Sequence, residues 1–167
     1  ATPWTLFVGW IAPHFPLVVP RRWLDRIDAA RIVLPARGAP RHPWVERMAG
    51  FCDHDAALGS DARRRQALHA YLALVAFVDE QVGRVLQALE DTGLAATTRV
   101  LFTADHGDNL GARGLWNKCV LYGDSTRVPL LLAGPGVAQR RCTTPVSLSD
   151  VDATVRQGAG LPPGPGA

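Results

Sequence analysis

A long amphipathic pattern followed at once by a short apolar run constrains this chain more than any other feature. Residues 61–92 carry apolar side chains at spacings of three and four, which is the period of one helix face. Ser60 is a suitable N-cap for that helix, and Gly93 is a suitable C-terminal stop. The run 99–104 that follows is short and apolar, as expected of a buried strand. We therefore predict a helix over 61–92 that leads directly into a strand.

Two further apolar runs complete the pattern of a layered domain. Residues 4–10 are rich in aromatic and β-branched side chains, and they predict a buried strand of the kind found in parallel sheets. Residues 128–133 predict another strand. Helix and strand in succession, separated by loops rich in Gly and Pro, indicate a protein of the α/β class.

The remainder of the chain is expected to be mostly irregular. Six prolines interrupt residues 13–60, where only a short helix over 21–27 is predicted. A long surface excursion of this kind often lines a binding cleft. A last helix is expected over 149–157, and the Pro- and Gly-rich residues 161–167 predict a linker or tail.

Length, composition and charge exclude several classes of protein. The 167 residues are enough for one domain with a core of its own. Hydrophobic residues make up 47% and charged residues 20%, values that exclude wholesale disorder. The formal charge is +3, but no Lys- and Arg-rich tract alternates with aromatic residues, so nucleic acid is not an expected partner. No apolar run is long enough to span a bilayer.

The cysteines and the start of the chain bear on its origin. Cys52, Cys119 and Cys142 are too few and too irregularly spaced for a zinc ribbon or a disulfide scaffold, although one disulfide stays open. Their odd number favours a reducing compartment, so a cytoplasmic location is expected ahead of a periplasmic one. The chain opens without Met and enters a strand-like run almost at once. We therefore expect it to be a fragment of a longer domain.

A carboxylate and an imidazole stand side by side directly after the predicted strand 99–104. Ligands of open α/β sheets bind beyond the carboxyl ends of the strands, and Asp105 and His106 fall at such an end. Followed by Gly107, they form a compact pair of candidate metal ligands, and Asp108 is a candidate to orient the imidazole or a bound water. The alternative is a plain Asp-His-Gly turn in which the Asp caps the backbone and the His is exposed.

One lysine follows in a loop punctuated by glycines. Lys118 is the single Lys among 18 cationic residues, and it ends the loop 111–118. An ammonium at this place is suited to bind a tetrahedral oxyanion as a point charge. The alternative is an ordinary solvated Lys. Arg127 is expected to fix the loop through carboxylates such as Asp124 rather than to contact substrate.

A histidine follows the first predicted strand. His14 lies just past residues 4–10, and therefore on the expected sheet edge of Asp105. Pro13 and Pro16 restrict the backbone on both sides of it. Its imidazole is suited to donate a hydrogen bond to an anionic substrate or to protonate a leaving group. A His satisfied within a rigid loop is the alternative.

These residues together resemble a known family. Residues 103–118 read Thr-Ala-Asp-His-Gly-Asp-Asn-Leu-Gly-Ala-Arg-Gly-Leu-Trp-Asn-Lys, which closely resembles the late signature of the sulfatase family. The resemblance is to the branch with phosphonate monoester hydrolases and choline-sulfatase-like enzymes. Residues 12–16, 71–86 and 127–136 support it, so it spans nearly the whole chain.

The resemblance implies a fold and a place within it. The sulfatase family belongs to the alkaline-phosphatase superfamily. It implies a partial layered α/β fold whose mostly parallel central sheet is flanked by helices. Residues 1–160 would form the C-terminal part of a sulfatase catalytic domain, and 161–167 would be a linker or tail.

The resemblance also assigns roles. Asp105 and His106 would bind a metal, and Lys118 and His14 would contact the sulfate, phosphate or phosphonate group and its leaving oxygen. One divalent ion is implied, Ca²⁺ first, with Mn²⁺, Mg²⁺ and Zn²⁺ as alternatives, because the site mixes hard oxygen with imidazole. Many sulfatases carry Asn where His106 stands, and His is more typical of the phosphonate and phosphodiester hydrolases. The expected substrate is a small-molecule sulfate or phosphonate ester.

The family nucleophile is missing from its usual motif. It is a Cys converted to formylglycine within Cys-x-Pro/Ala/Ser-x-Arg, and none of the three cysteines precedes that pattern. The early paired aspartates of the metal site are missing as well. The formylglycine is therefore expected upstream, and this chain alone is expected to be inactive.

We accordingly predict a fragment of a metal-dependent sulfuric ester hydrolase. One alternative is a fragment of a phosphonate monoester or phosphodiester hydrolase. The other is a non-catalytic remnant that binds anions or a partner protein. The oligomeric state is left open.

Overall fold

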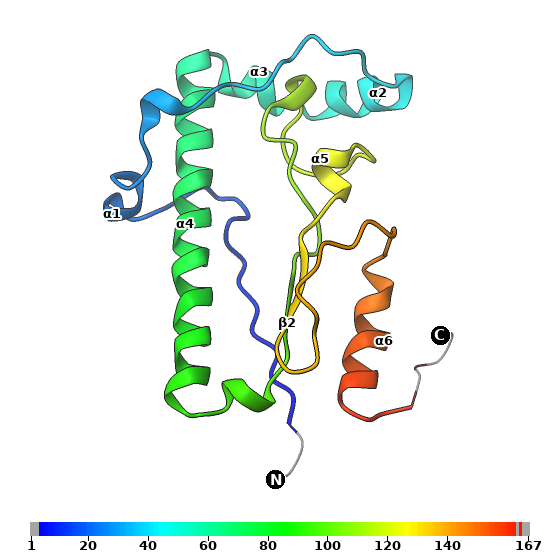
Figure 1. The fold of residues 1–167 in the computed structure, drawn as a ribbon. Coiled ribbons are helices and arrows are strands. Elements are labelled where there is room, and N and C mark those ends of the chain that lie inside the picture. Colours follow the sequence, from blue (N-terminus) through cyan, green and yellow to red (C-terminus); the bar gives the residue numbers. More distant parts are fainter. Residues whose placement is uncertain (1–3, 163, 165–167) are drawn as a thin grey trace. The chain divides into compact units, whose positions relative to one another are not determined.

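The computed structural model describes residues 4–162 and 164. The chain divides into two compact units, one of residues 10–135 and one that joins the residues up to 9 with those from 136 onward. In chain order the elements are α1 (Arg21–Leu24), η1 (Ala29–Arg31), α2 (Pro43–Phe51), α3 (His54–Leu58), α4 (Asp61–Asp91), η2 (Ala95–Thr97), β1 (Val100–Thr103), η3 (Ala112–Gly114), α5 (Gly123–Thr126), β2 (Leu130–Ala133) and α6 (Ser149–Gly158) (Figure 1).

The long helix α4 confirms the helix predicted over 61–92. At its start, the Ser60 side chain accepts a hydrogen bond from the backbone N–H of Arg63 at 3.3 Å, which satisfies one of the free amides of the first turn. At its end, Gly93 takes a φ of 71°, and the N–H of Leu94 donates to the carbonyl of Leu89 at 3.0 Å. This is a Schellman stop. Ser60 and Gly93, from which the two ends of the helix were predicted, therefore do determine those ends.

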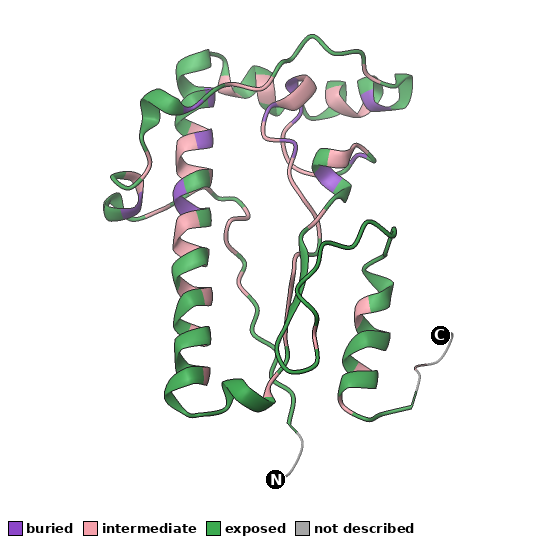
Figure 2. Ribbon diagram, in the orientation of Figure 1, coloured by how far each residue is buried: buried purple, intermediate pink, exposed green. Residues whose placement is uncertain are grey.

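Burial along α4 is uneven. Its buried residues are Arg64, Leu68, Ala73 and Leu74, and Figure 2 shows them towards the end of the helix that adjoins α3. Helices α1 and α3 both pack against α4. From α1, Trp23 is 1% exposed, and its ring lies edge to face with that of Phe77. The predicted short helix over 21–27 is thus confirmed, and it covers part of α4.

Strands β1 and β2 confirm the strands predicted over 99–104 and 128–133. They pair antiparallel, with Val100 opposite Ala133 and Thr103 opposite Leu130. The sheet of the described residues therefore differs from the parallel arrangement that was predicted. The reason lies in the connecting loop, which folds back on itself and returns the chain to the end of β1 that it left.

The smaller unit holds residues 4–9 and α6. The strand predicted over 4–10 is not formed, because a strand exists through its ladder to a neighbour and no described strand pairs with this run. Phe7 is instead 90% exposed. Helix α6 confirms the helix predicted over 149–157. The predicted tail at 161–167 lies largely outside the described residues.

The segment 13–60 contains two helices, α2 and α3, that were not predicted because of its many prolines. Pro43 occupies the first turn of α2, where a missing N–H costs nothing, and the His42 side chain accepts a hydrogen bond from the N–H of Trp44. Asp53 caps α3 by accepting from the N–H of Ala56 at 2.9 Å. No helix in the described part of the chain combines the length and apolar character needed to cross a membrane.

Candidate anion and metal site

Asp105 and His106 follow β1 directly, within the larger unit. The Nδ1 atom of His106 lies 2.9 Å from the carbonyl oxygen of Gly107, and a carbonyl only accepts, so Nδ1 carries the proton. The free lone pair is then on Nε2, which lies 3.5 Å from Oδ2 of Asp105. Metal-binding imidazoles are commonly held in this way, with the second nitrogen donating to a backbone carbonyl. The pair thus presents two electron-pair donors close together, as a divalent cation requires.

Gly107 explains why the turn after this pair is so tight. Its N–H donates to the carbonyl of Ser125 at 2.7 Å. A Cβ at this position would collide with the carbonyl oxygen of Asp124. A glycine is therefore required here for the close approach of the site loop to α5.

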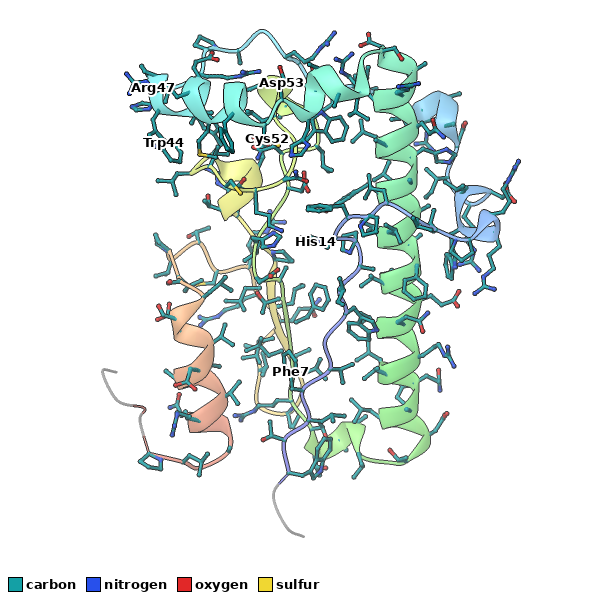
Figure 3. All side chains as sticks on the ribbon, turned by 180° about the vertical axis from the view of Figure 1, so that it is seen from behind. Phe7, His14, Trp44, Arg47, Cys52 and Asp53 are labelled. Atoms are coloured by element: carbon teal, nitrogen blue, oxygen red, sulfur yellow. The ribbon has the colours of Figure 1, made fainter. Side chains whose placement is uncertain are left out.

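His14 and Lys118 are brought together from positions 104 residues apart in the sequence. Lys118 Nζ is hydrogen-bonded to His14 Nε2. His14 Nδ1 lies 2.7 Å from the Phe15 carbonyl oxygen and therefore donates to it, so that Nε2 is the acceptor facing the ammonium. The Phe15 ring stacks on the imidazole and also lies under the ammonium, 5.5 Å from its centroid to Nζ. Figure 3 shows His14 on the loop that runs beside α4.

His14 and His106 connect the Asp105–His106 pair with the His14–Lys118 pair. The rings of His14 and His106 lie edge to face with their centroids 6.1 Å apart. The structure therefore brings His14, Lys118, Asp105 and His106 into one cluster, with each residue near at least one other. Among the described residues, no three His, Cys, Asp or Glu side chains converge as a complete metal cage. The cluster holds two candidate ligands and two candidate anion-binding groups.

The loop from residue 108 to 119 bends sharply. Leu110, Arg113, Asn117 and Cys119 all have positive φ, which non-glycine residues rarely adopt. Oδ1 of Asp108 accepts hydrogen bonds from the N–H groups of Leu110 at 2.9 Å and Asn117 at 3.0 Å. Through Oδ1, the Asp108 carboxylate therefore stabilises the loop backbone.

Asn109 is a site-loop residue that the sequence reasoning missed. It is 3% exposed, and its Nδ2 donates to the carbonyl of Asn117 and to Oγ of Ser125. Its backbone N–H also donates to the Asn117 carbonyl at 2.9 Å. The sequence offered one signal for this residue. It stands next to Asp108 in the motif, at a place where the chain must turn back.

Asp55 anchors the same loop from the side of α3. Its Oδ1 accepts hydrogen bonds from Arg64 Nε at 2.7 Å and from the Trp116 indole N–H at 3.0 Å. Burial by itself works to raise the pKa of Asp55, but the hydrogen bonds from Arg64 and Trp116, with the charge of Arg64, lower it below 3.8 overall. The carboxylate is thus held ionised between α4 and the Lys118 loop. Sequence reasoning also missed this residue.

Tyr71 and Asp124 both interact with residues of the loop 108–119. Burial raises the pKa of Tyr71, on α4, and the negative charge of Asp108 raises it further. Asp124 pairs with Arg113 at 2.9 Å. The expected partner of Asp124 was Arg127, whose side chain packs instead against Gly123. The loop is therefore fixed by an arginine of its own.

Comparison with known proteins identifies the family. The sequence profile of the sulfatase family, described as "Sulfatase", matches residues 1–161. The chain belongs to the sulfatase family. The family predicted from the motif at 103–118 is thereby confirmed.

A choline-sulfatase shares the sequence and two phosphonate monoester hydrolases share the fold, as expected for the branch that the motif indicated. The chain is 36% identical over 163 residues to a choline-sulfatase of Rhizobium meliloti, covering 95% of this chain and 32% of the relative. It is similar in structure to a phosphonate monoester hydrolase of Silicibacter pomeroyi, with a TM-score of 0.81 and 30% identity over 90% of this chain and 32% of that one. A phosphonate monoester hydrolase of Agrobacterium radiobacter gives a TM-score of 0.80 at 26% identity, over 91% of this chain and 34% of that one. The α/β class is therefore confirmed, and the chain spans about a third of the length of these proteins.

Proposed function

We propose that the sulfatase of which this chain forms a part hydrolyses small-molecule sulfate esters. The observation that carries the proposal is the hydrogen bond between Lys118 and His14, placed beside the Asp105–His106 pair. A lone ammonium, a fixed imidazole and two metal-binding side chains are the groups that an ester of a strong acid needs at its reacting end. His14 comes from a loop far in the sequence from the other three residues.

Lys118 supplies positive charge. When a sulfate group binds at Lys118 Nζ, the ammonium neutralises charge on the equatorial sulfate oxygens. This electrostatic stabilisation grows as negative charge develops in the transition state. The Phe15 ring lies 5.5 Å from Nζ, and its cation–π attraction favours this position of the ammonium. Lys118 is therefore assigned to bind the sulfate group and to stabilise its charge.

His14 is assigned to the leaving oxygen. Its Nδ1 is occupied by the Phe15 carbonyl, so Nε2 is the only ring nitrogen that exchanges a proton with substrate. A sulfate ester takes the place of the direct contact between Nε2 and Lys118. In its protonated form His14 then donates the Nε2 proton to the departing alcohol oxygen, which leaves as a neutral alcohol.

Asp105 and His106 are assigned to one divalent metal ion. Enzymes of this family generally use such an ion and a formylglycine nucleophile. When bound, the metal supplies Lewis acidity at the reacting group. The carboxylate and imidazole suit Ca²⁺ first, and Mn²⁺, Mg²⁺ or Zn²⁺ as alternatives. The remaining ligands, the nucleophile and the mostly parallel sheet that would carry them are assigned to residues beyond this chain.

Phosphonate ester hydrolysis is the second candidate. Two phosphonate monoester hydrolases share this fold at TM-scores of 0.81 and 0.80, and His106 stands where many sulfatases carry Asn. Both reactions place a tetrahedral anion on the same groups. The candidates therefore differ in preference between sulfur and phosphorus and not in the residues used.

The test compares matched esters. The full-length protein is assayed on an aryl sulfate and on a phosphonate monoester with the same aryl leaving group, with and without prior metal removal. Faster turnover of the sulfate, lost on chelation and restored by a divalent metal, is expected. Faster turnover of the phosphonate would favour the second candidate, and hydrolysis of neither ester would overturn both. The 167-residue chain alone is expected to turn over neither ester, because none of its cysteines precedes the formylglycine pattern.

A further inference from the structure

We infer that Asp108 and Asn109 are positioning residues that fix Lys118 relative to the candidate metal ligands. The inference rests on the proposed function, because it concerns how the same site is held. Neither residue is assigned to touch substrate. Their part is to set where the ammonium stands when the substrate arrives.

The geometry is that of a two-residue clamp on the residue before Lys118. Asp108 Oδ1 accepts from the Asn117 N–H at 3.0 Å, and the Asn109 N–H donates to the Asn117 carbonyl at 2.9 Å. The side-chain Nδ2 of Asn109 donates to the same carbonyl. Both backbone polar groups of Asn117 are thus held by the two residues that follow the Asp105-His106-Gly107 turn. Asp108 and Asn109 therefore connect the Asp105-His106-Gly107 turn to the residue before Lys118.

The clamp holds a backbone conformation that is unfavourable by itself. Asn117 has a φ of 68° and Cys119 a φ of 27°, so the residues on both sides of Lys118 are in positive-φ regions. Such conformations persist only where the surrounding contacts over-determine them. Without the clamp we expect this stretch to relax and Lys118 to leave His14.

The side-chain amide of Asn109 fits this part because it has two hydrogens to donate. The residue is 3% exposed, and Nδ2 uses its two hydrogens on the Asn117 carbonyl and on Ser125 Oγ at 2.9 Å. Asp at this position has the same shape but no hydrogen to donate, and it would turn an oxygen towards a carbonyl oxygen. Asn109→Asp therefore replaces one hydrogen bond of the clamp by a repulsion between two oxygens, with almost no change in volume.

The contact between Lys118 and His14 provides a readout that does not depend on activity. The ¹⁵N signal of His14 Nε2 in the 167-residue chain reports whether that nitrogen accepts a hydrogen bond from Lys118. Lys118→Met provides the reference signal for the lost contact. We expect Asn109→Asp to give the signal of Lys118→Met while circular dichroism shows the helices retained. A folded Asn109→Asp chain with the wild-type His14 signal would overturn the inference.

A second pair of variants decides the matter if Asn109→Asp does not fold. Asp108→Asn keeps an oxygen that accepts from the Asn117 N–H, and Asp108→Ala removes it. The His14 signal should stay as in the wild type in Asp108→Asn and move to the Lys118→Met position in Asp108→Ala. A wild-type signal in Asp108→Ala would overturn the clamp.

Activity separates this inference from the proposed function. In the full-length protein Asn109→Asp should lower kcat for a sulfate ester about 100-fold, because a displacement of about 1 Å costs that much at a catalytic group. If the His14 signal moves but the wild-type protein hydrolyses no ester, the proposed function fails and the clamp stands. If the wild-type protein is active and Asn109→Asp leaves both kcat and the His14 signal unchanged, the clamp alone fails.

Discussion

The two halves of α4 carry the same apolar stripe but differ in their surroundings. Up to Leu74 the helix has four buried residues, and Tyr71 lies close enough to Asp108 for its charge to raise the tyrosine pKa. In residues 75–91, all of which the structure describes, no residue is buried, and Leu86 is 41% exposed. Periodicity determines which face of a helix is apolar, and contacts from other elements determine whether that face is covered. The candidate site adjoins the covered half.

The sharpest test of this difference replaces one leucine in each half. Leu68 is 6% exposed, so Leu68→Ala should lower the free energy of unfolding by about 2–5 kcal/mol through lost burial and a cavity. Leu86→Ala, on the same stripe, should change it by no more than about 0.5 kcal/mol. Urea unfolding followed by circular dichroism measures both. Equal losses would show that the two halves are equally covered.

The next test breaks the contact between the covered half and the Lys118 loop. Asp55→Asn removes a charged acceptor from Arg64 and Trp116 and should cost about 1–3 kcal/mol near neutral pH. The folded-state pKa of Asp55 lies below 3.8, so its contribution is complete above that pH and is lost as the pH falls through the folded pKa. The difference between wild type and Asp55→Asn should therefore shrink in acid.

The control for that measurement is Asp79→Asn, at an exposed position of α4. It should change the free energy of unfolding little at any pH. A stability difference for Asp55→Asn that stays constant from neutral pH to well below 3.8 would contradict the account of this carboxylate.

The smallest expected effects concern two glycines at the uncovered end of α4. A Cβ at Gly83 meets no atom within 4 Å, so Gly83→Ala should raise the free energy of unfolding by about 0.5–1 kcal/mol through helix propensity. Gly93 has a φ of 71°, so Gly93→Ala should lower it by about 1 kcal/mol. Thermal unfolding of both variants measures the two changes. A destabilising Gly83→Ala would show that this part of the helix is covered after all.

Local signals predicted most of the described fold. Ser60 and Gly93 set the ends of α4 as expected, and the apolar runs at 99–104 and 128–133 became β1 and β2. The run at 4–10 did not become a strand, because its pattern says nothing about whether a partner lies beside it. Helix α2 was not predicted because proline is incompatible with a helix interior. Pro43 is, however, compatible with the first turn of a helix, where it lies in α2.

The sequence indicated the candidate ligands and anion-binding groups of the site, but it did not indicate the residues whose hydrogen bonds hold the site loop. Asp105, His106, Lys118 and His14 were identified from their residue types and from their places after strands or within loops. Asn109 and Asp55 were not, because their importance rests on hydrogen bonds to residues that are distant in the sequence. Buried polar residues of this kind look like ordinary loop residues until the chain is folded.

Replacement of Lys118 in the full-length protein tests the proposed sulfate ester site most directly. Lys118→Ala should lower kcat/KM for a sulfate ester about 100- to 1,000-fold, as expected for the loss of one charged group that stabilises the transition state. Arg63→Ala, which removes an exposed cation from the first turn of α4, is the matched control and should leave the rate unchanged. A Lys118→Ala protein with the wild-type rate would contradict the proposed site.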